Sequence, residues 1–209
     1  MYTAIFTLAL AASASARPGK RQSSCITDTV NNPNQQQIID SINQWNSDVN
    51  NVNNFLNTAH TLSGSDLSSA ANNALISASD EPCQLGTLSS ISDIGGDAFT
   101  CAVNDLKNIF GTHVLDNLNK ILSNVDDTSA VTDAINDINL FRCCNVLPDA
   151  DILFTDASES DGAGDSVQKT AGRPDACASI NCAKANPKCV EQDNGEFGTV
   201  DGGKEPNSK

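Results

Sequence analysis

An apolar stripe with the period of an α-helix is the feature that most constrains the fold of this chain. Between residues 34 and 58 the large apolar side chains recur at alternating spacings of four and three residues, at Ile38, Ile42, Trp45, Val49, Val52 and Leu56. That period places them on one face of a helix. The opposite face is mostly Asn, Gln, Ser and Asp, and Asn is a mediocre helix former. We therefore expect a helix that begins near Pro33 and needs packing against neighbours.

Similar stripes follow downstream and predict several more short helices. Potential capping residues and the helix breakers Gly and Pro suggest their limits. The expected limits are Ser65 to a stop before Pro82, a short helix over 85–91, Asp97 to Gly111, a start at Thr112, a start near Thr128, and a short turn from Pro148 to Phe154. No stretch of the sequence alternates apolar and polar residues as a strand does. The prediction is an all-α bundle of six or seven short helices with sequential neighbours antiparallel.

The composition of the chain changes at residue 155. An acidic stretch of small residues and glycines begins there, and few large apolar residues follow it. Segments of this kind bury too little apolar surface to fold alone. We expect a helical domain over 22–154 and a largely irregular tail over 155–209.

The first residues are typical of a targeting segment. A short apolar run ends in Ala14-Ser15-Ala16, the pattern after which signal peptidase cuts. The alternative, a membrane anchor, needs about 20 apolar residues, and this run is too short. We expect a signal peptide over 1–16 and a protein that is secreted, extracellular or associated with a cell wall.

A second cut is expected a few residues later. Lys20-Arg21 resembles the dibasic site of kexin-type processing proteases and would end a propeptide over 17–21, although the pair can also be read as an ordinary basic flank. The processing residues are thus Ala16, Lys20 and Arg21.

The charge of the chain excludes one class of partner. The sequence has 12 basic and 26 acidic residues and a net charge of −14. Removal of residues 1–21, which hold three basic and no acidic residues, deepens the net charge to −17. Such a charge repels phosphate backbones and anionic lipid surfaces. We expect no nucleic-acid partner and no transmembrane segment; an apolar surface, a cell-wall polymer or a host protein stays open, as does the oligomeric state.

Eight cysteines predict four disulfide bonds, because an even number in a secreted chain argues for pairing. They are Cys25, Cys83, Cys101, Cys143, Cys144, Cys177, Cys182 and Cys189. Five lie in the helical region and three in the tail. If all pair within the chain, either one or three bridges join the tail to the bundle. The alternative is a free thiol or an intermolecular bridge.

The adjacent pair Cys143-Cys144 predicts a junction. A bond between neighbours closes a strained ring, so we expect the two sulfurs to reach different partners. The expected partners lie among Cys25, Cys83 and Cys101. A zinc site is the competing interpretation, but the spacing lacks a C-x₂-C or paired-histidine motif.

Catalytic and metal-binding patterns are absent from the sequence. His60 and His113 belong to no motif, so we interpret both as ordinary polar surface positions. The acidic stretches 156–167 and 193–201 do not match an EF-hand loop. Paired carboxylates of a glycosidase are conceivable, but the chain expected after processing contains a single Trp and no Tyr to form a sugar platform. We expect no enzyme, no catalytic residue, no metal site and no cofactor.

The Asn- and Ser-rich helix from Ile38 to Phe55, together with the dibasic site, resembles small secreted fungal proteins. Over residues 28–153 the chain is loosely similar to the hydrophobic-surface-binding and cell-wall mannoprotein group. Its cysteines make it similar also to effector-type secreted proteins that act on a host. The resemblance implies a non-enzymatic surface or cell-wall protein that acts through amphipathic helices. The alternatives are a virulence effector that binds a host component and, third, an extracellular hydrolase.

Overall fold

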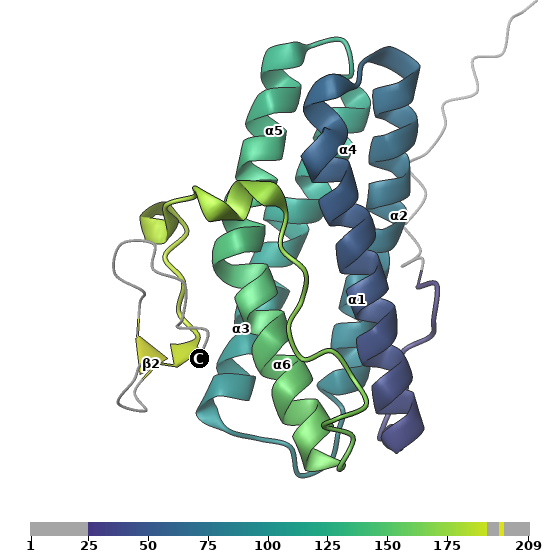
Figure 1. Ribbon diagram of the computed structural model, residues 1–209, viewed down its shortest axis with the longest axis vertical. Coiled ribbons are helices and arrows are strands. Elements are labelled where there is room, and N and C mark those ends of the chain that lie inside the picture. Colours follow the sequence, from purple (N-terminus) through teal and green to yellow (C-terminus); the bar gives the residue numbers. More distant parts are fainter. Residues whose placement is uncertain (1–24, 192–196, 199–209) are drawn as a thin grey trace, which may run out of the picture.

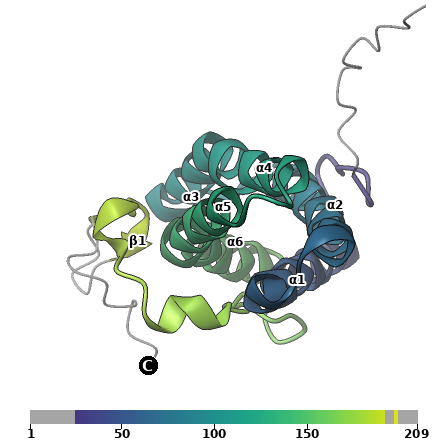
Figure 2. The same ribbon diagram turned by 90° about the horizontal axis from the view of Figure 1, so that it is seen from above.

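Four long helical rods form the bundle in this computed structural model, which describes residues 25–191 and 197–198. The rods run alternately up and down, and each packs on its sequence neighbour, as Figures 1 and 2 show. The fourth rod returns to contact the first. Their elements are α1 (Gln35–Thr58), α2 (Gly64–Leu88), α3 (Asp97–Phe110), α4 (Asp116–Ser123), α5 (Thr128–Phe141) and α6 (Leu147–Ser160). The predicted all-α bundle is confirmed.

The predicted count of six or seven separate helices is wrong, because two pairs of helices are continuous. The π-helical turn η2 (Gly111–Leu115) joins α3 to α4, and the π-helical turn η3 (Arg142–Val146) joins α5 to α6. Gly111 therefore ends no helix and Thr112 begins none. Pro148 lies inside this continuous rod, directly after η3, and therefore opens no separate helix. That helix runs to Ser160, past the predicted end of the helical region at residue 154.

The predicted stop before Pro82 is also wrong, since α2 continues through this exposed proline to Leu88. The segment 85–91 is therefore no separate helix. A proline inside a helix costs about 3 kcal/mol. Leu85 and Leu88 are 5% and 0% exposed, and burying each contributes about 1.5–3 kcal/mol. Packing of the last turns thus offsets the cost of the proline.

The first helix begins with a capping box that the sequence analysis did not single out. Asn34 Oδ1 accepts a hydrogen bond from the backbone N–H of Gln37 at 3.0 Å, and Gln37 Oε1 accepts one from the N–H of Asn34 at 2.9 Å. The predicted caps Ser65 and Asp97 instead lie within the first turns of α2 and α3. The start predicted near Thr128 is confirmed, with Asp127 as the cap.

The predicted stripe of α1 forms the centre of the core. All six of its apolar residues are buried, and Trp45 packs edge-on against Phe154 of α6 with ring centroids 5.3 Å apart. Large exposed apolar side chains among the residues described are Ile26 and Ile76 alone. No helix in this part of the chain is both long enough and apolar enough to cross a membrane.

Four disulfide bonds pair all eight cysteines, as predicted: Cys25–Cys83, Cys101–Cys189, Cys143–Cys177 and Cys144–Cys182. Three of them join the tail to the bundle, which is one of the two numbers that parity allowed. The adjacent cysteines do bond to different partners. The expected partners were wrong, because both bonds go to the tail. Four disulfides indicate that the chain folds in an oxidising environment.

From residue 161 on, the described part of the tail is an irregular strap that lies along the bundle (Figure 1). Side chains of Asn46, Asn53 and Asn57 on α1 bond to backbone groups of Gln168, Gly172 and Asp175. A Cβ atom at Gly172 would come within 2.7 Å of Asn50 Oδ1, so a larger residue there would need the exposed side chain of Asn50 to shift. The strap also contains the short helices η4 (Asp175–Ala178) and η5 (Cys182–Lys184) and half of a two-stranded pair, β1 (Val190–Glu191) with β2 (Phe197–Gly198).

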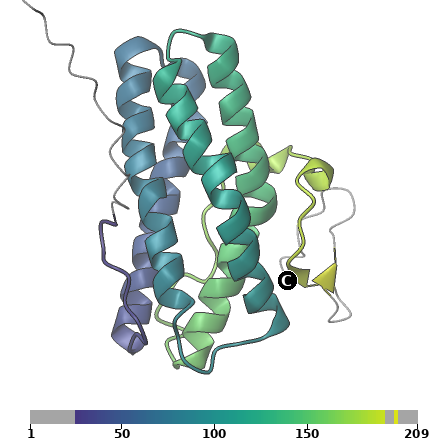
Figure 3. The same cartoon turned by 180° about the vertical axis from the view of Figure 1, so that it is seen from behind.

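The segment before α1 is bound to α2 in a similar way. Cys25 is bonded to Cys83, and Asp80 Oδ1 accepts the backbone N–H groups of Ile26 and Thr27. Figure 3 shows this segment beside the bundle, and it also shows the connection from α2 to α3 crossing one end of the rods. The predicted signal peptide and dibasic site lie outside the described residues.

The cross-link between this segment and α2 gives the first prediction. Replacing Cys25 and Cys83 together by Ser should lower the free energy of unfolding by about 2–4 kcal/mol, because the unfolded chain loses a long closed loop. Urea unfolding would measure the change. Thr27→Ala is the control, since Thr27 uses only its backbone to bond Asp80. A loss no larger than that of the control would contradict the prediction.

Candidate functional site

Helix irregularities surround the one apolar pocket that we consider a candidate site. The pocket has a volume of about 250 Å³ and lies between α2 on one side and α3 and η2 on the other, with α1 beneath. Pro82 interrupts the hydrogen-bond ladder of α2, and η2 widens the facing rod. The lining residues are Trp45, Glu81, Pro82, Leu85, Gly86, Leu106, Lys107, Phe110, Gly111 and Leu115.

Aliphatic and aromatic carbon makes up most of the wall. Leu85, Leu106 and Phe110 are buried, and Leu115 is half-buried at the mouth. Gly86 and Gly111 also line the pocket. A Cβ at Gly111 would meet no atom within 4 Å, whereas one at Gly86 would meet the side chain of Thr29 at 2.9 Å. Concave sites with apolar walls and few polar groups are typical of small-molecule binding.

A buried ion pair contributes one of its members, Glu81, to the pocket lining. Arg142 Nη1 donates to Glu81 Oε1 at 2.9 Å, and the indole Nε1 of Trp45 donates to Glu81 Oε2 at 3.0 Å. Both charged side chains of the pair are 0% exposed. A third contact joins Arg142 Nη2 to Asn53 Oδ1 at 3.4 Å. One network thus ties α1, α2 and η3 together beneath the pocket.

The charge of Glu81 is balanced inside the bundle. Burial raises the pKa of Glu81 above its ordinary value, because desolvation disfavours the carboxylate. The guanidinium of Arg142 and the indole of Trp45 oppose that rise, since both stabilise the ionised form. Both carboxylate oxygens already accept a hydrogen bond. This arrangement is suited to shaping a site and not to transferring a proton.

A second group of carboxyls lies farther along the contact between α1 and α2. Asp48 faces Asp80 and Glu81, and desolvation is the largest cause that raises the pKa of Asp48 to about 7. The neighbouring carboxyl of Asp80 adds to the rise, while a hydrogen bond from Gln44 lowers it. Asp80 in turn accepts hydrogen bonds from Gln84 and from the segment before α1. This group connects the two helices with the start of the described chain.

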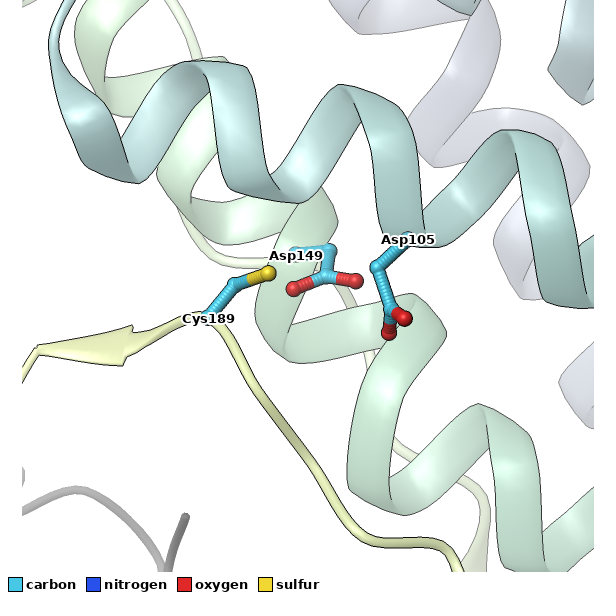
Figure 4. Close-up of side chains that lie close together, drawn as sticks. All are labelled: Asp105, Asp149 and Cys189. Atoms are coloured by element: carbon cyan, nitrogen blue, oxygen red, sulfur yellow. The ribbon is translucent and has the colours of Figure 1, made fainter. Parts of the chain in front are cut away.

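A third group contains Asp105, Asp149 and Cys189, shown in Figure 4. Their oxygen and sulfur atoms lie within 4.8 Å of one another, a spacing at which a metal ion can be held. The sulfur of Cys189 is bonded to Cys101, however, and is no thiolate ligand. Desolvation and the adjacent Asp105 raise the pKa of Asp149 to about 9. A proton shared by the two carboxyls explains the group better than a metal does.

The two histidines lie apart from the pocket lining. His60 is exposed in η1 (Ala59–Thr61). His113 was predicted at a helix start, but it lies inside η2, half-buried and stacked on Phe141. Its Nδ1 is 2.9 Å from Asp137 Oδ2 of α5, so it links two rods. The processing residues Ala16, Lys20 and Arg21 lie outside the described residues.

Sequence reasoning missed the residues at the floor of the pocket. A signal for them exists, because Arg142 occupies the next position of the buried stripe through Val131 and Ile138. Glu81 likewise follows Ala74 and Ala78 on the buried face of α2. A charged residue in register with an apolar stripe predicts a buried ion pair. The two positions could not have been matched to each other without the fold.

Comparisons with known proteins give no family for this chain. No protein-family model matches the sequence, and neither a curated protein nor a solved structure is significantly similar to it. The function is therefore inferred from the sequence and the geometry of the fold.

The buried ion pair gives a prediction about stability. Glu81→Gln should lower the free energy of unfolding by about 3–5 kcal/mol, because it leaves the charge of Arg142 buried and unpaired. Chemical denaturation would measure this. Glu159→Gln is the matched control, since its ion pair with Lys169 is exposed and contributes less than about 1 kcal/mol. If the two substitutions lowered the free energy of unfolding equally, the buried pair would contribute no more to stability than the exposed pair, which would contradict the prediction.

The raised pKa values predict the direction of the pH dependence. An acid with a higher pKa in the folded state binds its proton more tightly there, so stability falls as the pH rises through that pKa. The protein should lose stability from about pH 4 to 7 through Asp48 and on to about pH 9 through Asp149. Asp48→Asn should flatten the first part of the curve and Asp149→Asn should flatten the second. Thermal unfolding across this range would show it; a curve unchanged by both substitutions would contradict the assignment.

Proposed function

We propose that this protein is a secreted, non-enzymatic component of a fungal surface or cell wall that binds a small apolar molecule in the pocket between α2 and α3. The observation that carries the proposal is the apolar lining contributed by Leu85, Leu106, Phe110 and Leu115. Transfer of an apolar molecule from water to such a wall is favourable in proportion to the area removed from water. The volume of about 250 Å³ suits a ligand smaller than most drugs.

A binding role fits the site better than catalysis. The acid at its floor, Glu81, has both oxygens engaged by Arg142 and Trp45. His113 is held by Asp137 and lines no part of the pocket. Within the described ranges, the pocket lining holds no histidine, cysteine, serine or threonine to act as a nucleophile or base.

Association with an apolar surface would use the folded bundle and not released helices. The apolar faces of the helices are buried against one another, and Ile26 and Ile76 are the large apolar side chains that the described surface exposes. Four disulfides oppose opening of the bundle. The pocket is more enclosed than the open groove around Ile76, which argues for uptake of single molecules at the wall.

Secretion is supported by the disulfides and by the apolar run over residues 1–16. A secreted effector that removes a host molecule would use the same pocket. Fractionation separates the two, because a wall protein should stay with the cell wall and an effector should be free in the surrounding fluid.

The proposal can be tested by filling the pocket. Trp45 is the single tryptophan of the chain and lines the pocket, so its fluorescence should change saturably when 1-octanol is added. Gly111→Phe should weaken this binding by at least about tenfold, as expected if roughly two methylenes stay outside. A Cβ at Gly111 meets no atom within 4 Å, so the substitution should leave the fold intact.

Asn108→Phe is the matched control, because Asn108 is exposed on the same rod and lines no part of the pocket. Melting curves of both variants would confirm that they fold. A titration without saturation, or equal binding by the wild type and Gly111→Phe, would refute the pocket as the site.

A further inference from the structure

An unpaired lysine stands at the pocket. Two of its lining residues are charged, Glu81 and Lys107, and the charge of Glu81 is balanced by Arg142. Lys107 is exposed on α3 and has neither an ion-pair nor a hydrogen-bond partner within residues 25–191. The pocket therefore presents apolar walls together with one uncompensated positive charge.

The charge of the whole chain makes this position informative. With 26 acidic and 12 basic residues, a lysine has many possible acidic partners. Lys169 and Arg173 are indeed paired, with Glu159 and Asp151. Lys107, Lys120, Lys184 and Lys188 have no such partner among the described residues, and of these lysines Lys107 is the one that lines the pocket. A positive group at the edge of an apolar cavity matches a molecule with an anionic head and an apolar body.

We propose that the ligand is a medium-chain carboxylate, with its head on Lys107 and its alkyl chain along Leu106 and Phe110 toward Trp45. This inference rests on the proposed function and narrows its ligand class. Since Lys107 is exposed, the carboxylate stays partly hydrated and need not be buried with its charge. Binding removes apolar surface of both the alkyl chain and the pocket wall from water, and this burial supplies most of the affinity.

The position of the ion pair explains why the opposite orientation is disfavoured. A carboxylate at the pocket floor would approach Glu81, which lines the same cavity and whose oxygens are bonded to Arg142 and Trp45. A ligand carboxylate there would lose its water with no cation free to pair with it, because Arg142 already pairs with Glu81. An alkyl end at the floor meets the ring of Trp45 instead, so the head is directed outward to Lys107.

A calorimetric titration with three ligands of equal chain length tests the head group. Octanoate should bind about two- to fivefold more tightly than 1-octanol at low salt, and octylamine should bind most weakly. Lys107→Gln should reduce the affinity for octanoate to that for octanol and leave octanol unchanged. Lys107→Glu should reverse the preference in favour of octylamine. Lys120→Gln is the control, since Lys120 is exposed on α4 and does not line the pocket.

Chain length tests the body of the ligand in the same protein. From hexanoate to octanoate each added methylene should tighten binding by about fourfold. Equal binding of octanoate and octanol, with no effect of Lys107→Gln, would overturn the carboxylate inference while the apolar pocket stands. If none of the three ligands binds saturably, or if Gly111→Phe leaves binding unchanged, both the carboxylate inference and the proposed apolar site are overturned.

Discussion

The buried ion pair between Glu81 and Arg142 is the interaction on which the rest of the structure depends. Two charges without exposed area are costly to desolvate, and the hydrogen bonds from Trp45 and to Asn53 are what make the pair tolerable. The pair joins α2 to the π turn η3. Because Trp45 belongs to α1, three of the four rods meet at this one point. The same carboxylate then forms the floor of the pocket.

The π turn that supplies Arg142 also places three further contacts in consecutive residues. Cys143 and Cys144 carry the tail through bonds to Cys177 and Cys182, and Asn145 donates to Asp105 at 2.9 Å. In a regular helix successive side chains point in directions about 100° apart. In η3, Arg142 contacts the core, Cys143 and Cys144 bond to the tail, and Asn145 contacts the neighbouring rod. The position of the strap is thereby linked to the ion pair.

The sequence predicts the rods better than it predicts their ends. The stripe from Ile38 to Leu56 is buried as expected, because a period of 3.6 residues is a property of the pattern alone. Pro82 and Gly111 were read as breaks, but packing of the residues beyond them outweighs local preference. The asparagines of α1, unfavourable for a helix by themselves, bond to the backbone of the tail. That use depends on a segment more than 100 residues away and has no local signature.

The cysteines and the pocket show the same limit. Parity predicted that the tail is tied to the bundle, but the partners of Cys143 and Cys144 depend on where the tail lies. The pocket combines residues from α1, α2, α3 and η2, so no window of sequence contains it. What sequence does offer is Glu81 and Arg142 in register with apolar stripes.

The central claim is that the space above Trp45 and Glu81 holds the alkyl chain of a ligand. Nuclear Overhauser contacts between bound octanoate and the methyl groups of the protein test it most directly. The terminal methyl of octanoate should contact Leu85 and Leu106. Contacts confined to the open groove around Ile76 and Ala70, between α1 and α2, or no contacts at all, would contradict the account.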